Sequence, residues 1–372
     1  LLNGETYIQG GSGGGDRPEI RSAAGAFRTM DGVNTSALNT SFPRNFVAPD
    51  GRVFGYDSDS GQMYFVNTSG TGSIAMGARF NTGLSGGWHS STAMYRPGRI
   101  LQIGGNSNGA YTIDITSGTP VVAATQSMAA TRQWLNATVL ADGKVAATSG
   151  TVVAENASQP TNYVEIWDPQ TGQWTRGPAA QRTRMYHSNA ILLPDGSLLT
   201  SGGGAGSPTL SSDPNQNNLN AEIYYPPYLF AAGGLRAARP TITTAPNYID
   251  IGKTYGVDVN GAAGVSRVTL VKTGSMSHSF NFEQRFLDLT FKTTGTHVQI
   301  QAPTRAGEAP PGYYMLFVFN DAGVPSVAKV IRMGVATDPN PSITPVISNP
   351  GAQTTIVGSA ANLALSAADP RG

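Results

Sequence analysis

The chain has no cysteine, few charged residues and no long hydrophobic run. Without cysteine, these 372 residues hold no disulfide, thiolate metal ligand or thiol nucleophile. Charged residues make up 13% of the chain and the formal net charge is +1, which disfavours partners such as nucleic acid or an anionic membrane surface. No apolar run approaches the roughly 20 residues of a membrane-spanning helix. We therefore expect a neutral partner, no nucleic acid and no membrane span.

Glycine and proline are abundant, with 46 and 24 residues respectively. Such a composition disfavours long amphipathic helices and favours turn-rich β structure, so the predicted fold class is all-β. Leu1 is neither an initiator methionine nor the charged start of a signal peptide. We therefore expect the chain to begin inside a longer protein.

A repeat runs through the first two thirds of the chain, in which an apolar strand is followed by a turn with glycine. The turn glycines are 47, 47, 45 and 53 residues apart: Gly4, Gly51, Gly98, Gly143 and Gly196. This period is typical of kelch-like propeller blades. The sequence therefore predicts a partial kelch-like β-propeller over residues 1–238, with about five blades before residue 236.

The blade period is lost after Arg239-Pro240. Residues 239–335 contain alternating strands and predict an Ig-like β-sandwich. Residues 336–346 hold three prolines and predict an extended linker. Residues 347–372 predict the start of a further Ig-like or cadherin-like domain, too short to be complete.

Two side chains that can bind a metal, Tyr186 and His187, directly precede the apolar strand that ends at Pro194-Asp195-Gly196. Taken alone, they are better explained by packing at the edge of a blade. A further imidazole, His278, stands in its own Ser-His-Ser motif. The presence of both motifs in one chain favours the interpretation as a metal site.

The sequence resembles the copper radical oxidases, the family of galactose oxidase and glyoxal oxidase. The resemblance covers about residues 184–333, whereas residues 1–183 share only the blade pattern. The motifs that carry it follow in order: RMYHS (184–188), LLPDG (192–196), EIYYPPYL (222–229), RP (239–240), SHS (277–279), QR (284–285), PGYYMLF (311–317) and GVPS (323–326).

The resemblance implies a seven-bladed propeller and a sandwich that extends one histidine up the central channel to a copper ion. By position, Tyr186 corresponds to the axial tyrosine and general base, His187 to one equatorial imidazole, and His278 to the imidazole from the sandwich. These donors suit the chemistry, because imidazole nitrogen and phenolate oxygen favour Cu(II) and a bound metal lowers the pKa of a phenol.

The family also has a tyrosyl radical cofactor, formed by a tyrosine cross-linked to a cysteine. The resemblance places both residues upstream of Leu1, in a portion of the same protein that would also complete the propeller. Where the family often has an aromatic residue shielding the radical, this chain has the Ser-Gly-Gly-Gly run of residues 12–15.

Other candidates line the same edge of the predicted propeller. His89 and Trp134 stand nine residues before their turn glycines, as His187 does, and Trp88 adjoins His89. Trp88 and Trp134 could form a sugar-stacking or substrate wall, with core or rim packing as the alternative. His89 is a candidate substrate-binding residue of the same pocket, although a hydrogen-bonded structural histidine is the favoured alternative.

Arg44 precedes the second blade strand, and the resemblance implies a contact with substrate hydroxyls, although its spacing to Gly51 is shorter. His297 lies in an alternating strand and is predicted to be exposed.

Two functions remain open. The first is a secreted or cell-surface copper radical oxidase, which converts a primary alcohol or an aldehyde with O2 to the aldehyde or acid and hydrogen peroxide. The second is a non-catalytic carbohydrate-binding or adhesion module that keeps the same scaffold. A tyrosine and a cysteine upstream of Leu1 would distinguish the oxidase from the module.

Overall fold

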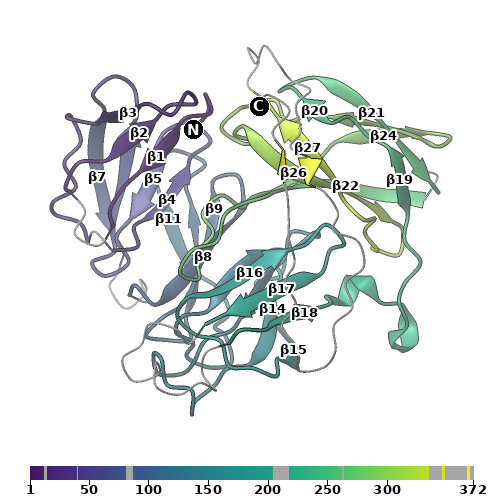
Figure 1. The fold of residues 1–372 in the computed structure, drawn as a ribbon, viewed down its shortest axis with the longest axis horizontal. Coiled ribbons are helices and arrows are strands. Elements are labelled where there is room, and N and C mark those ends of the chain that lie inside the picture. The colour runs from purple at the N-terminus through teal and green to yellow at the C-terminus, as the bar shows by residue number, and fades with distance from the viewer. Residues whose placement is uncertain are drawn as a thin grey trace.

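The structure is a computed structural model that describes residues 1–11, 15–39, 41–80, 87–203, 218–261 and 264–334, with two short strands beyond them. Within these ranges it contains β-strands and two 3-10 turns, η2 (Pro227–Leu229) and η3 (Ala232–Gly234), and no α-helix. The all-β fold is therefore confirmed (Figure 1). No helix in the described ranges is long and apolar enough to cross a membrane.

Five antiparallel sheets succeed one another over the first part of the described chain. Their strands follow in order: β1 (Thr6–Ile8), β2 (Glu19–Arg21), β3 (Phe27–Thr29); β4 (Arg44–Val47), β5 (Val53–Tyr56), β6 (Gln62–Asn67), β7 (Ser73–Arg79); β8 (Ser90–Arg96), β9 (Arg99–Gly104), β10 (Ala110–Asp114), β11 (Val121–Ala124); β12 (Asn136–Val139), β13 (Val145–Thr148), β14 (Tyr163–Trp167), β15 (Trp174–Ala179); β16 (Ser188–Leu192), β17 (Leu198–Gly202), β18 (Ala221–Tyr224). These are the predicted blades.

Burial falls from the inner to the outer strand in the sheets β8–β11 and β12–β15. Strands β8 and β12 are buried along almost their whole length, whereas β7, β11 and β15 are largely exposed. The inner strands β8, β12 and β16 are neighbours in space. Adjacent blades therefore meet at their inner strands, as in a propeller.

Four of the glycines that revealed the repeat occupy the left-handed turn that follows an inner strand, and the fifth, Gly4, lies in the turn before β1. All five have φ between +71° and +90°, a region that residues with a Cβ adopt at a cost. At Gly143 a Cβ would also lie 2.8 Å from the ring of Phe286. The repeat thus reflects a local backbone requirement and, at Gly143, a close contact with the following domain.

Two further sheets follow the blades (Figure 1). One has the order β19-β21-β25-β24 and the other β20-β27-β26-β22-β23. Their strands are β19 (Thr241–Thr244), β20 (Tyr248–Ile249), β21 (Thr254–Asn260), β22 (Val265–Lys272), β23 (Phe286–Asp288), β24 (Phe291–Thr294), β25 (His297–Gln301), β26 (Gly312–Asn320) and β27 (Lys329–Met333). A separate apolar core fills the space between the sheets, which form the predicted sandwich.

The sandwich and the blades also share a core. Met315 and Phe317 of β26 belong to the same buried cluster as Val139 and Leu192 of the blades. The sandwich is thus held against the blades by continuous apolar packing.

The predicted boundaries at residues 238, 335 and 346 stay predictions. Of residues 335–372, the structure describes only β28 (Val346–Ile347) and β29 (Ala367–Ala368), which pair with each other. Most of the predicted linker and of the predicted final domain lies outside the described residues, as do residues 12–14.

Candidate metal centre

Aromatic and imidazole rings gather at the end of the inner strands where each strand begins. His89 and His187 directly precede β8 and β16, and Trp134 stands two residues before β12. Tyr186 lies against His187, with ring centroids 3.8 Å apart, and against Trp134, at 4.3 Å. The predicted residues of successive blades therefore meet at one place.

The residues that join β22 to β23, 273–285, form a finger loop that runs along the inner strands. The amide of Gln284 donates to the carbonyl oxygen of Ala137 at 2.7 Å and accepts from the amide of Val139 at 2.8 Å. Ser91 donates to the carbonyl oxygen of Ser279 at 3.3 Å. Because it is bound in this way to blade backbone, the finger loop holds a fixed position among the blades.

His278 is carried by the finger loop into the ring cluster. The centroid of its imidazole lies 4.8 Å from that of His187 and 5.5 Å from that of Tyr186. The three predicted metal ligands are thus brought together, two from a blade and one from the sandwich.

The backbone is strained at this cluster. Seven non-glycine residues have positive φ in the described part of the chain, and four of them carry rings of the cluster: Phe42 (+53°), Trp134 (+57°), His187 (+65°) and His278 (+52°). Each such conformation costs on the order of 1–3 kcal/mol and is typical of functional sites.

The donor chemistry fits a copper ion. Two imidazoles and a phenol within contact distance form a nitrogen and oxygen set of the kind that binds Cu(II). The hydroxyl of Ser277 lies 2.6 Å from Nδ1 of His278, which leaves Nε2 of that ring for a metal. The described residues contain no group of three His, Cys, Asp or Glu side chains that could hold a metal ion, so a site with three protein ligands here needs the phenol of Tyr186.

Burial sets the protonation of these groups. It lowers the pKa of His278, and the neighbouring His187 lowers it further, so the neutral, ligating form of the imidazole is favoured. Burial, followed by the charge of Glu155, raises the pKa of Tyr186. Without a metal the phenol therefore stays protonated, and its phenolate is a stronger base than usual.

The predicted wall residues surround the ligands. Trp134 is 3% exposed and Trp88 is 41% exposed, and their rings contact each other at 5.7 Å. His89 lies against both tryptophans, and burial lowers its pKa. The ring contacts of His89 are thus with the predicted wall residues.

Arg44 lies beneath the rings and not at the pocket surface. It is fully buried, and its guanidinium donates to the carbonyl oxygens of Phe42, Trp88 and Ser90 at 3.1, 3.1 and 2.8 Å. Burial lowers its pKa to about 10. Because this guanidinium is already bound to the backbone, the placement does not support the predicted contact with substrate hydroxyls.

Phe42 was missed by sequence reasoning. Its ring contacts those of Trp88, Trp134, Tyr186, His278 and Phe280, at centroid distances from 5.3 to 6.4 Å. The signal was present, because Phe42 stands nine residues before Gly51, the spacing that singled out His89, Trp134 and His187. The sequence analysis predicted a substrate contact for Arg44, in the same segment, and made no prediction for Phe42.

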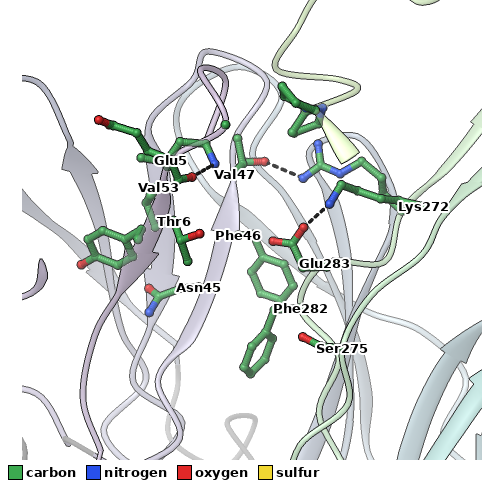
Figure 2. A pocket seen from close by; sticks show the side chains of 16 residues that line it. Glu5, Thr6, Asn45, Phe46, Val47, Val53, Lys272, Ser275, Phe282 and Glu283 are labelled. Atoms are coloured by element: carbon green, nitrogen blue, oxygen red, sulfur yellow. Dashed lines mark hydrogen bonds and ion pairs between the residues drawn. The ribbon is translucent and has the colours of Figure 1, made fainter. Parts of the chain in front are cut away.

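A pocket of about 620 Å³ opens onto the cluster, lined by Phe42, Tyr186, His278 and Phe280. A second pocket, of about 330 Å³, shares Asn45, Phe282 and Glu283 with the first. Figure 2 shows this second pocket between β4 and the finger loop, with the ion pair of Lys272 and Glu283 on one side. His297, by contrast, is exposed on β25 and bonded to Asp258, as its strand position predicted.

Comparisons with known proteins agree with this arrangement. Residues 239–333 match the family described as "Galactose oxidase-like, Early set domain", and residues 153–180 match the Kelch motif. Galactose oxidase of Gibberella zeae is 34% identical over 206 residues, which cover 54% of this chain and 29% of that protein. Aldehyde oxidase GLOX of Vitis pseudoreticulata is 35% identical over 159 residues, or 40% of this chain and 30% of that protein.

Among solved structures, a fungal alcohol oxidase of the AA5 family, in complex with copper, superposes with a TM-score of 0.81 and 25% identity. The match covers 89% of this chain and 73% of that one. The chain spans less than a third of the length of the two curated relatives above. The family-model matches, the two curated relatives and the structural match confirm the predicted resemblance to the galactose oxidase and glyoxal oxidase family.

Proposed function

We propose that this chain carries the copper site of a copper radical oxidase, an enzyme that oxidises a primary alcohol or an aldehyde with O2. The observation that supports it best is the convergence of Tyr186 and His187 from a blade with His278 from the finger loop. The chain would divide into a partial propeller, residues 1–238, and a sandwich, residues 239–335, that supplies one ligand.

The proposed roles follow from the donor set. His187 and His278 would hold the copper through neutral imidazole nitrogen, and Tyr186 would be the third ligand from this chain. A bound copper supplies Lewis acidity and one-electron redox chemistry. Two electrons and two protons pass from the carbinol to O2, so a primary alcohol gives one aldehyde and one hydrogen peroxide.

Tyr186 would also act as the general base. Its pKa is raised by burial, so its phenolate, once formed, has a high affinity for the proton of the substrate hydroxyl. The ring lines the pocket together with Phe42 and His278, which gives a hydroxyl in the pocket direct access to it. The tyrosyl radical that would take the hydrogen atom from carbon is expected only if sequence upstream of Leu1 supplies its tyrosine and cysteine.

A second candidate function is a non-catalytic carbohydrate-binding or adhesion module. The half-exposed indole of Trp88 favours it, because flat exposed indoles stack on sugar rings. For either function we propose a secreted or cell-surface location, as for a protein that acts on small alcohols, aldehydes or carbohydrates outside the cell.

The experiment uses the protein with its upstream portion, loaded with copper. Peroxide release is followed on galactose, glyoxal, glycerol and simple alcohols, and peptide mapping is used to find a tyrosine peptide joined to a cysteine peptide. Copper bound at one per chain, the cross-link and peroxide release would support the oxidase. Copper binding with neither cross-link nor peroxide would favour the binding module.

A further inference from the structure

We propose that the pocket selects ligands that carry an apolar, flat group next to the reacting carbon, and not polyhydroxylated sugars. In this proposal the ring of Phe42 forms the selecting wall, and Arg44 is a positioning residue that holds the wall in place. The inference rests on the proposed function only in naming the reacting carbon, because the selection itself concerns binding.

Phe42 stands at the centre of the wall. It is stacked on the exposed Trp88, with an interplanar angle of 29°, and its ring is 5.3 Å from that of His278 and 6.4 Å from that of Tyr186. It therefore lies between the candidate metal ligands and the exposed indole. Because Phe42 and Tyr186 line the same pocket, a ligand with its hydroxyl at Tyr186 would place its neighbouring group against the ring of Phe42, which is backed by Trp88.

Arg44 contacts three separate segments of the chain, and two of them carry the pocket residues Phe42 and Phe280. Its hydrogen bonds join the backbone of Phe42, which precedes β4, to the backbone of Trp88 and Ser90 at β8. Its guanidinium also lies 3.8 Å from the centre of the Phe280 ring on the finger loop. No carboxylate of the described chain pairs with it. The positively charged guanidinium of Arg44 therefore contacts two blades and the finger loop at once.

Three larger polar side chains that line the pocket are already paired within the chain. Gln9 and Asn45 bond to each other and to the hydroxyls of Tyr7 and Tyr64. Glu283 is paired with Lys272. A polyol could bond to these three side chains only by displacing their present partners, and each polar group left unpaired weakens binding strongly.

The test measures binding to the copper-free chain by saturation-transfer NMR and calorimetry. The probes are benzyl alcohol and D-galactose, and the variants are Phe42→Ala and Phe42→Leu, which keeps apolar volume without a flat ring. Phe27→Ala is the matched control, because Phe27 is an exposed aromatic residue of β3 that does not line the pocket.

We expect benzyl alcohol to bind more tightly than galactose, and each Phe42 variant to weaken it about threefold to tenfold, as the loss of one aromatic contact predicts. Phe27→Ala should leave binding unchanged. Tighter binding of galactose, or unchanged binding of benzyl alcohol by a folded Phe42→Leu chain, would overturn the proposal.

Arg44→Lys tests the positioning role. Lysine keeps the charge but cannot form the same set of bonds, so we expect weaker benzyl alcohol binding together with a changed near-ultraviolet circular dichroism signal of the tryptophans. Arg52→Lys, at an exposed arginine, is the control. If Arg44→Lys abolished galactose binding and left benzyl alcohol binding unchanged, Arg44 would be a substrate contact and the proposal would be wrong.

Copper titration of the same unmodified chain separates the two proposals. A chain that binds no copper but prefers benzyl alcohol contradicts the proposed oxidase and supports the apolar wall. A chain that binds copper but prefers galactose supports the copper site and contradicts the wall.

Discussion

The imidazole rings of His187 and His278 lie with their centroids 4.8 Å apart, although one precedes a propeller strand and the other comes from the sandwich. Each histidine is followed by a serine, Ser188 or Ser279, and a contact between these two serines holds the imidazoles at this distance. The hydroxyl of Ser279 lies 3.4 Å from both the hydroxyl and the carbonyl oxygen of Ser188, and both pairs are buried. The two imidazoles are therefore positioned by a contact directly behind them.

Replacing His278 with alanine should abolish tight copper binding, because the site would lose one of its two imidazoles. The loss should exceed the roughly 10- to 100-fold cost of removing an outer partner of a metal ligand. Isothermal titration with Cu(II) measures it. His297→Ala is the control, since His297 is exposed on β25 and bonded to Asp258. Equal copper stoichiometry and affinity in the His278 variant would refute the assignment.

Replacing Tyr186 with phenylalanine should leave copper bound by both histidines but depress turnover. The loss of a general base typically costs about 10²- to 10⁴-fold in rate. Peroxide release by the protein with its upstream portion measures the effect, and copper content is checked in the same samples. Wild-type turnover in a variant that retains its copper would show that Tyr186 is not the base.

Replacing Gln284 with leucine should destabilise the protein and weaken copper binding. The buried carbonyl oxygen of Ala137 and amide of Val139 would lose their partner, and each unsatisfied group costs about 1–3 kcal/mol. Urea unfolding and copper titration measure the two effects. Gln301→Leu, at a partly exposed position of β25, serves as control. A variant as stable as the parent would mean that the finger loop is held by its other contacts alone.

The copper-free chain should become less stable as the pH falls below about 6.5, the ordinary pKa of histidine. Burial lowers the pKa of both His89 and His278 in the folded chain, so the unfolded chain takes up protons first. The neutral imidazoles therefore contribute fully to the free energy of unfolding above the pKa of histidine in the unfolded chain. This contribution is lost as the pH falls through their lower pKa in the folded chain. Urea midpoints between pH 7.5 and 5.5 measure it.

The two single variants His89→Gln and His278→Ala should each reduce this pH dependence. A midpoint that rises on acidification, or a slope unchanged in both variants, would contradict the prediction.

Most of the fold could be predicted because its signals are local. A left-handed turn needs glycine at Gly98 or Gly143 whatever surrounds it, so the repeat is visible in the sequence. The same spacing placed His89, Trp134 and His187 at one edge. The same spacing applies to Phe42, which is the ninth residue before Gly51.

His278 is a different case. Neither period nor spacing joins it to His187, and only the resemblance to a known family predicted their meeting. The bonds of the finger loop to Ala137, Val139 and Ser91 explain why the meeting occurs. These bonds link residues far apart in the chain, so hydrophobic periodicity, which depends on neighbouring residues, does not predict them.

By itself, the sequence determined the strands, the turns, the fold class and the types of donor at the site, because turn geometry and strand burial depend on neighbouring residues. The tertiary structure alone decided which side chains face the pocket. Arg44 and Phe42 are two positions apart, yet the guanidinium is bound beneath the rings and the phenyl ring faces the ligands. That choice depends on Trp88, Ser90 and Phe280, whose positions relative to Arg44 only the folded chain defines.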